Sequence, residues 1–166
     1  MTHPPEAPAA PGWTRREAAD GRLSLEVPPG WEVVEAPSPG VALVVVEPQD
    51  GTEFRSNLVL TVGELPPTMT FRDWQAGNDE LLGSSLQEYL LVDLEHTEVG
   101  GLPAVRRLAH HTAPPDLPVT LQQWAVLVDG QGVTLSATTT DLGFGRLAPV
   151  FERVGGSLSL EGAWAR

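Results

Sequence analysis

The sequence predicts an α+β fold, in which a single antiparallel β-sheet of six to seven strands carries one long and one short helix packed mainly on one face. Three observations support this prediction. Short stretches of alternating apolar and polar residues recur between Pro- and Gly-rich turns, which is typical of antiparallel strands. The stretch from Thr70 to Leu90 has helical periodicity instead. The segment from Val119 to Thr140 contains two long strands joined by a tight turn, and we expect the sheet to form around this hairpin.

Length and charge limit the class of protein. The 166 residues fit one domain, and we expect it to cover residues 13–160, between a disordered Pro- and Ala-rich tail at 1–12 and a C-terminal tail at 161–166. The net charge is −12, with 22 acidic residues against ten basic ones, all of them Arg. Because an acidic surface repels phosphate backbones and anionic lipids, we expect no nucleic-acid partner and no binding to a membrane surface.

Three absences from the sequence narrow the class of protein further. The chain contains no cysteine, which excludes disulfides, thiolate metal sites and cysteine nucleophiles. The first residues have neither the basic nor the apolar region of a signal peptide, and no apolar run approaches the ~20 residues of a membrane span. We therefore expect a cytoplasmic protein.

Three strands are expected in the first third of the chain. Residues 22–27 alternate between apolar and polar positions, and Pro28-Pro29-Gly30 ends this strand because prolines cannot continue a ladder. Residues 41–47, VALVVVE, are nearly all apolar, which is typical of a strand covered on both faces. Residues 57–63 alternate again, and two prolines close that strand.

The long helix is predicted from Thr70 to Leu90. Thr70 followed by Asp73 resembles a capping box with Asp in place of Glu. Two glycines within it, Gly77 and Gly83, each cost about 1 kcal/mol relative to alanine, so packing on the sheet must hold this helix. The stripe expected to pack consists of Phe71, Trp74, Asn78, Leu81, Leu82, Ser85 and Tyr89.

Residues 90–97 and 104–112 are expected to form an antiparallel pair across Gly100-Gly101. With those two glycines as the loop, Leu94 faces Arg107, Glu95 faces Arg106, and Val92 faces Ala109. The next residues, 113–118, contain three prolines and are predicted as a loop.

In the hairpin from Val119 to Thr140, a two-residue loop places both apolar sets on the same side, whether the loop is Asp129-Gly130 or Gly130-Gln131. The core side then consists of Trp124, Val126, Val128, Val133, Leu135 and Ala137. The reverse side carries Leu121, Gln123, Ala125 and Leu127 beside a ladder of Thr and Ser. A short helix is expected at 146–154, with Pro149 in its first turn, and a brief last strand at 157–160.

No residue pattern predicts catalysis, a cofactor or a metal. His110 and His111 are adjacent on a strand and therefore point to opposite faces, so they cannot chelate one ion together. The same alternation places Arg106 and Arg107 on opposite faces, so the two side chains cannot bind one anion together. No serine lies in a G-x-S-x-G motif.

Several motifs occur in the order found in one known fold. LSLEVPPGW at 23–31, SNLVLTV at 56–62, VGGLPAVR at 99–106 and PVFERVGGSL at 149–158 resemble the corresponding segments of PsbP-like domains. That fold is shared with the yeast Ran-binding Mog protein and with bacterial LpqN-like proteins, which usually carry a lipobox that is absent here. Some bacterial relatives are chaperones that cradle apolar segments of secreted toxins against their sheet. The resemblance therefore implies a binding or adaptor role.

The leading hypothesis is a non-catalytic adaptor or chaperone, associated with secretion, that recognises a protein partner through its sheet face. The expected partner-binding residues are Leu121, Gln123, Ala125 and Leu127. Apolar residues on an otherwise open face need a cover, supplied by a partner, a homodimer mate or a terminal segment. The alternative is a small-molecule or lipid carrier, with a pocket between helix and sheet lined by Trp74, Leu82 and Trp124. An enzyme of unrecognised type is the third hypothesis.

Overall fold

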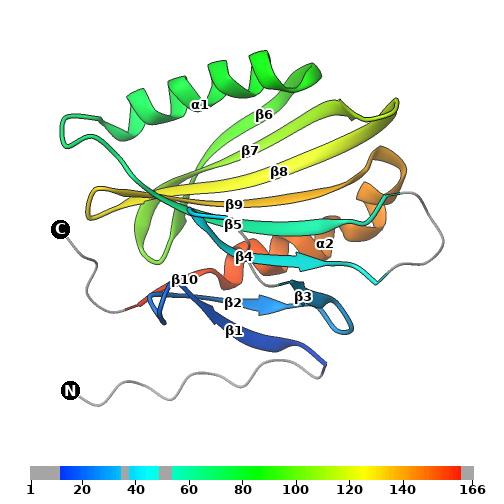
Figure 1. The fold of residues 1–166 in the computed structure, drawn as a ribbon, viewed down its shortest axis with the longest axis horizontal. Coiled ribbons are helices and arrows are strands. Elements are labelled where there is room, and N and C mark those ends of the chain that lie inside the picture. The colour runs from blue at the N-terminus through cyan, green and yellow to red at the C-terminus, as the bar shows by residue number, and fades with distance from the viewer. Residues whose placement is uncertain (1–11, 35–37, 49–53, 162–166) are drawn as a thin grey trace.

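The computed structural model describes residues 12–34, 38–48 and 54–161, and within these ranges the chain forms two antiparallel sheets and two helices (Figure 1). A seven-stranded sheet has the order β3-β4-β5-β9-β8-β7-β6, and a three-stranded sheet has the order β1-β2-β10. The α+β class is confirmed, whereas the prediction of a single sheet is wrong. The strands are β1 (Thr14–Ala18), β2 (Leu23–Val27), β3 (Glu32–Val34), β4 (Val41–Val46), β5 (Asn57–Glu64), β6 (Gln87–Val99), β7 (Leu102–Ala113), β8 (Leu117–Val128), β9 (Gln131–Thr140) and β10 (Ser159–Leu160); the helices are α1 (Phe71–Ser85) and α2 (Asp141–Ser157).

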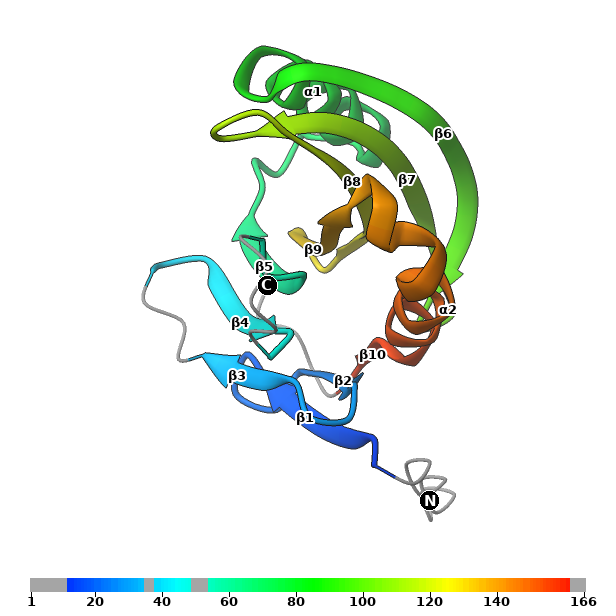
Figure 2. The same ribbon diagram turned by 90° about the vertical axis from the view of Figure 1, so that its right-hand side faces the viewer.

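The two helices lie on opposite faces of the seven-stranded sheet (Figures 1 and 2). Trp74 of α1 lies so close to Gly132 of β9 that a Cβ there would be 2.5 Å from its indole ring, whereas Trp124 lies as close to Gly155 of α2. In the β8–β9 register, Trp124 and Gly132 belong to opposite faces. We call these faces the α1 face and the α2 face. The prediction that both helices pack mainly on one face is wrong, because the apolar alternation identifies only the α2 face.

The main core fills the space between the α2 face, helix α2 and the small sheet. Strand β2 contributes Leu23 and Leu25, which are 0% and 1% exposed, and α2 contributes Phe151, which is 0% exposed. The six residues predicted as the core side of the hairpin all belong to this cluster: Trp124, Val126, Val128, Val133, Leu135 and Ala137. The alternation in the β8–β9 hairpin therefore predicted the core correctly.

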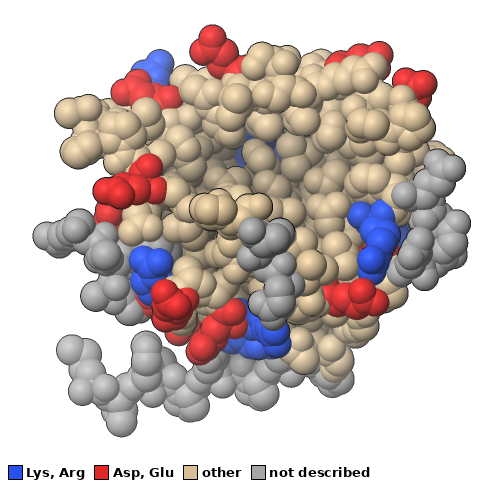
Figure 3. Space-filling view, viewed as in Figure 1, with Lys and Arg blue, Asp and Glu red and all other residues tan. Residues whose placement is uncertain are grey.

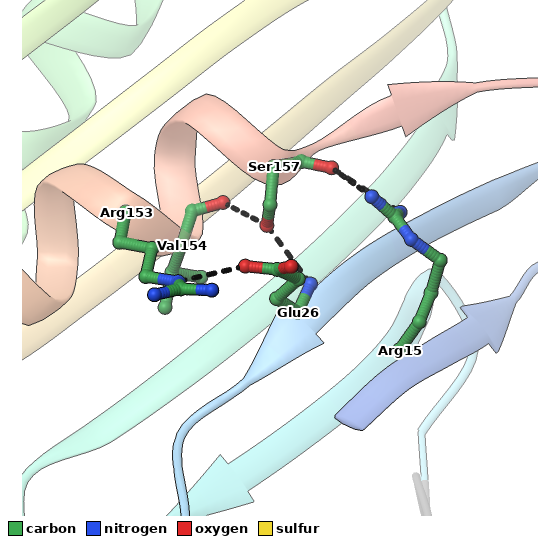
Figure 4. Close-up of polar contacts among 5 residues, drawn as sticks. All are labelled: Arg15, Glu26, Arg153, Val154 and Ser157. Carbon is green, nitrogen blue, oxygen red and sulfur yellow. Dashed lines mark hydrogen bonds and ion pairs between the residues drawn. The ribbon is translucent and has the colours of Figure 1, made fainter. Parts of the chain in front are cut away.

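Polar contacts join the small sheet to the end of α2 (Figure 4). Arg153 of α2 donates from Nε to Oε2 of Glu26 at 2.8 Å, and its guanidinium lies 4.3 Å from the centre of the Trp13 ring. The backbone N–H of Glu26 donates to Oγ of Ser157 at 2.8 Å, and Arg15 donates to the carbonyl oxygen of Ser157 at 3.3 Å. These contacts connect the first two strands of the chain to the end of α2.

The β8–β9 hairpin has a two-residue loop, as predicted from the need to place both apolar sets of side chains on the same side of the sheet. Val128 pairs with Gln131, so the loop is Asp129-Gly130. Both loop residues have positive φ, 47° and 78°, as in the turns whose twist matches that of paired strands. Asp129 tolerates this conformation better than most residues, and Gly130 adopts it without steric cost.

The β6–β7 register agrees with the prediction near the Gly100-Gly101 turn and departs from it farther away. Leu94 pairs with Arg107 and Glu95 with Arg106, as expected. Ala109 pairs with Leu91 instead of Val92, because the register shifts between Leu91 and Asp93. Such a bulge inserts one extra residue, and a uniform alternation does not reveal it.

Both helix boundaries differ from the predicted ones. Thr70 caps α1 as expected, accepting a hydrogen bond on Oγ1 from the N–H of Asp73 at 3.1 Å, but the helix ends at Ser85 because β6 begins at Gln87. Helix α2 begins at Asp141, five residues before the predicted start at Arg146, and therefore contains Pro149 in its interior. The expectations of a short second helix and of Pro149 in its first turn are wrong.

Three further strand assignments were missed or misplaced. The short strands β1 and β3 were not predicted; β3 has only three residues, too few for a periodicity to show. Strand β8 begins at Leu117 and includes Pro118, within the stretch expected to be a loop. Pro118 still pairs with Thr112 in the β7–β8 register.

Candidate functional site

The four residues predicted to bind a partner lie on the α1 face, but they are not freely exposed. Leu121, Gln123 and Ala125 are 5%, 8% and 3% exposed, and Leu127 is half-buried. Leu127 pairs with Gly132, which lies against Trp74 of α1. The expectation that these side chains form an open surface is therefore wrong, because three of them are buried and the fourth lies beside the contact of α1 with β9.

Another part of the same face remains accessible. The registers place one set of side chains from β4, β5 and β9 on the α1 face, and they are half-buried: Val44, Val46, Asn57, Val59, Thr61, Thr134, Ser136 and Thr138. We call this set the open patch. It carries no ionisable group, and neither do the β8 residues beside it on this face. In Figure 3 uncharged side chains occupy most of the centre of the view, and both acidic and basic groups lie mainly toward its margin.

Helix α1 is seated loosely on the sheet. Among its described side chains only Gln75 is buried, and Leu81 is 60% exposed. A pocket of about 380 Å³ opens beside Trp74, between α1 and strands β5 and β9. A second pocket of about 540 Å³, which we call the Arg107 pocket, lies between α1 and strands β6 and β7. Its lining consists of Phe71, Arg72, Gln75, Ala76, Asp79, Leu94, His96, Val105 and Arg107.

At the base of the Arg107 pocket lies a buried cation. The side chain of Arg107 is 2% exposed, and its Nη1 forms an ion pair with Asp79, whose side chain is 44% exposed. Nη1 also donates to the Tyr89 hydroxyl at 3.1 Å, and Nη2 lies 3.5 Å from Oε1 of Gln75. Neither Nε of Arg107 nor Nε2 of Gln75 has a hydrogen-bond partner among the described residues. Buried donors without partners cost free energy, so this cluster is under-satisfied.

The pocket predicted for the carrier hypothesis does not form as expected. Trp74 lines the smaller pocket beside α1, whereas Trp124 lies under Gly155 on the opposite face of the sheet. The two indoles therefore cannot line one pocket. Leu82 is half-buried on α1.

Sequence reasoning missed the Arg107 cluster, although two signals for it were present. The predicted register already paired Arg107 with Leu94, which lines the pocket. Gln75 and Asp79 are four residues apart on α1 and therefore share one side of the helix. What the sequence does not show is that this side of α1 faces the sheet.

Strand β6 presents a second accessible apolar feature at the edge of the large sheet. Leu90, Val92 and Leu94 are 61%, 48% and 48% exposed. The bulge in this strand and its acidic residues are features that discourage pairing with another chain. We therefore assign no partner to the β6 edge.

The two adjacent histidines point to opposite faces, as predicted. His110 Nδ1 lies 3.0 Å from Oγ1 of Thr120 and 3.3 Å from Oδ1 of Asp141, at the start of α2. The Thr120 hydroxyl donates to Asp141 at 2.7 Å, so it is not held as a nucleophile toward the imidazole. Among the described residues no group of three His, Cys, Asp or Glu side chains is placed to hold a metal.

The pKa of His111 is lower than the ordinary value for histidine. Burial lowers its pKa, and a backbone hydrogen bond at Thr112 and the charge of Asp141 oppose this shift in part. Its Nδ1 is buried without a partner among the described residues. The neutral imidazole is therefore the form that the folded protein favours.

The fold is that of the PsbP/Mog-type proteins. The chain is similar to cyanobacterial PsbP from Synechocystis, with 17% identity and a TM-score of 0.69 over 92% of this chain and 95% of that one. It is similar to LpqN of Mycobacterium tuberculosis, a protein involved in cell envelope biogenesis, with 16% identity and a TM-score of 0.67 over 90% and 91%. It is also similar to the Saccharomyces cerevisiae Ran-binding protein Mog1p, with 12% identity and a TM-score of 0.64 over 89% and 95%.

These similarities establish the fold alone, which the sequence motifs had implied. No protein-family model matches the chain, and none of the curated proteins matches it by sequence. No helix within the described ranges has the length and apolar character needed to cross a membrane.

Proposed function

We propose that this chain is a non-catalytic protein-binding module that holds an uncharged, apolar segment of a partner protein on the open patch of its α1 face. The observation that carries the proposal is the absence of charge from that surface. The protein has a net charge of −12, yet the open patch combines Val, Thr, Ser and Asn side chains without one ionisable group.

The chemistry of the open patch favours one kind of occupant. An apolar partner segment gains by covering Val44 and Val59, and the hydroxyls of Thr138 and Ser136 offer hydrogen bonds at little desolvation cost. A charged segment would lose its hydration here without meeting an opposite charge. One structural neighbour is a Ran-binding protein, so this fold is capable of protein recognition.

The proposal includes an adaptor or chaperone role in the cytoplasm for a partner destined for secretion. The resemblance of the sequence motifs to those of PsbP-like relatives supports the adaptor or chaperone role and the link to secretion. A second copy of the chain in place of a partner protein is an alternative outcome of the test below.

Affinity capture with a matched pair of variants tests the proposal. Thr138→Asp places a carboxylate on the half-buried open patch, whereas Thr68→Asp makes the same change at an exposed position before α1. Burying an uncompensated charge at an interface costs at least ~1–3 kcal/mol, so we expect about tenfold to hundredfold weaker binding for Thr138→Asp. The partner is identified by mass spectrometry, and its purified form is then titrated against both variants.

Equal affinity of both variants for the captured partner would exclude the open patch as the binding surface. Capture of only the chain's own copies, with loss of the dimer in Thr138→Asp, would replace the partner protein by a homodimer. Thermal unfolding of both variants shows whether each is folded at the temperature of the titration.

A further inference from the structure

The Arg107 pocket has the properties of a binding site for a small organic anion, separate from the open patch. We propose that it binds a carboxylate carrying an aliphatic chain, with the carboxylate on Arg107 and Gln75 and the chain along the apolar wall. This inference goes beyond the proposed function and does not depend on it, because no residue of the open patch lines this pocket.

The hydrogen-bonding edge of Arg107 that suits a carboxylate is nearly vacant. A guanidinium presents Nε and Nη2 side by side, and this pair matches the two oxygens of a carboxylate. Asp79 and Tyr89 occupy Nη1. The Nε–Nη2 edge has only the 3.5 Å contact of Nη2 with Gln75, and Nε has no partner among the described residues.

Gln75 supplies a further donor beside this edge. The residue is 8% exposed, and its Nε2 has no partner among the described residues. At present Oε1 of the same amide faces Nη2 of Arg107. If a bound carboxylate rotated the Gln75 side chain, this one weak contact would be replaced by several charge-assisted hydrogen bonds to the carboxylate. Both unpartnered donors belong to residues that are more than nine-tenths buried, so a ligand that accepts hydrogen bonds from them would remove a free-energy cost.

The rest of the pocket defines the body of the ligand. Phe71, Leu94 and Val105 form apolar walls, and Leu94 is 48% exposed, so an aliphatic chain would cover it. Two arginines, Arg72 and Arg107, line the pocket against the single carboxylate of Asp79. In a chain of net charge −12 this local excess of positive charge selects an anion over a neutral or cationic ligand.

Isothermal titration calorimetry with decanoate tests the inference, and decanol serves as the uncharged probe of the same chain length. We expect decanoate to bind the wild type at least about tenfold more tightly than decanol, a ratio that corresponds to ~1.4 kcal/mol. Gln75→Glu places a carboxylate next to the vacant edge, so it should weaken decanoate binding at least about tenfold. Asn78→Asp makes the equivalent amide-to-acid change on α1, beside the other pocket, and should leave the affinity within about twofold.

The inference would be overturned by no binding of decanoate to the wild type, by equal binding of decanol, or by unchanged affinity in Gln75→Glu. Equal losses in Gln75→Glu and Asn78→Asp would also overturn it, since they would indicate a general effect of negative charge. The Gln75→Glu variant brings its new carboxylate next to a buried arginine and is therefore expected to fold, which thermal unfolding checks directly. None of these results bears on partner binding at Thr138.

Discussion

A single methyl group added to Gly155 should destabilise the protein, although alanine is the better helix former. In the structure a Cβ at this position would lie 2.3 Å from Cε2 and 2.5 Å from Cζ2 of Trp124. Trp124 is 5% exposed within the main core, so its rigid ring has little room to move. At Gly156, the next residue, no atom beyond its chain neighbours and its own helix backbone lies within 4 Å of the corresponding position, so this residue provides a matched control.

The two opposing effects can be compared. Replacing glycine by alanine in a helix stabilises it by roughly 0.5–1 kcal/mol. Overpacking a core usually costs ~1–3 kcal/mol, and carbon atoms prefer separations of about 3.5–4.0 Å, so a 2.3 Å approach lies at the upper end of that cost. We expect Gly155→Ala to lose ~2 kcal/mol, or ~4–8 °C in Tm, and Gly156→Ala to gain up to ~1 kcal/mol.

Urea denaturation followed by circular dichroism measures both free energies of unfolding. The two variants should differ by ~2–3 kcal/mol, with opposite signs relative to the wild type. Equal stability of Gly155→Ala and Gly156→Ala would refute the placement of α2 against Trp124, and with it the assignment of the two sheet faces.

Three further variants test other parts of the account. His111→Gln should flatten the pH dependence of stability. Burial lowers the histidine pKa in the folded protein, so the wild type loses stability as the pH falls below about 6.5, where the unfolded chain takes up the proton. An unchanged slope in thermal scans between pH 7.5 and 5 would contradict this prediction. Arg153→Ala, which removes the contact of α2 with Glu26 of the small sheet, should cost about 1 kcal/mol in urea denaturation at low salt and less at high salt, and insensitivity to salt would show that the charge contributes little. In Gly132→Ala the added Cβ would lie 2.5 Å from the Trp74 indole, but that indole is half-buried and can shift. The loss of stability should therefore be smaller than for Gly155→Ala, and a larger loss would mean that α1 is held rigidly.

The main core was predictable because it follows from local alternation and turn chemistry. The parity of the hairpin placed Trp124 and Val133 on one side, and the Asp129-Gly130 loop confirms that parity. Near the Gly100-Gly101 turn the β6–β7 register was also predictable, since loop length fixes the pairing of the residues beside it.

The candidate sites were less predictable because they depend on which element covers which face. The reverse side of the hairpin mixes Leu121 and Gln123 with threonines, and such a pattern does not distinguish a solvent-facing sheet from one under a helix. The burial of Arg107 requires α1 to bring Gln75 and Asp79 over β7, which is a long-range arrangement. The sequence motifs implied the fold, and no motif carried information about this pocket.

Site-specific photo-cross-linking tests whether the open patch holds a segment of the partner protein. A benzophenone amino acid replaces Thr138 on the open patch in one variant and Leu142, which is 99% exposed at the start of α2, in the other. After irradiation in the presence of the captured partner, mass spectrometry identifies the attached peptides. We expect adducts with an uncharged, apolar segment of the partner from position 138 and none from position 142. Adducts from position 142 alone, or adducts from position 138 with charged segments, would contradict it.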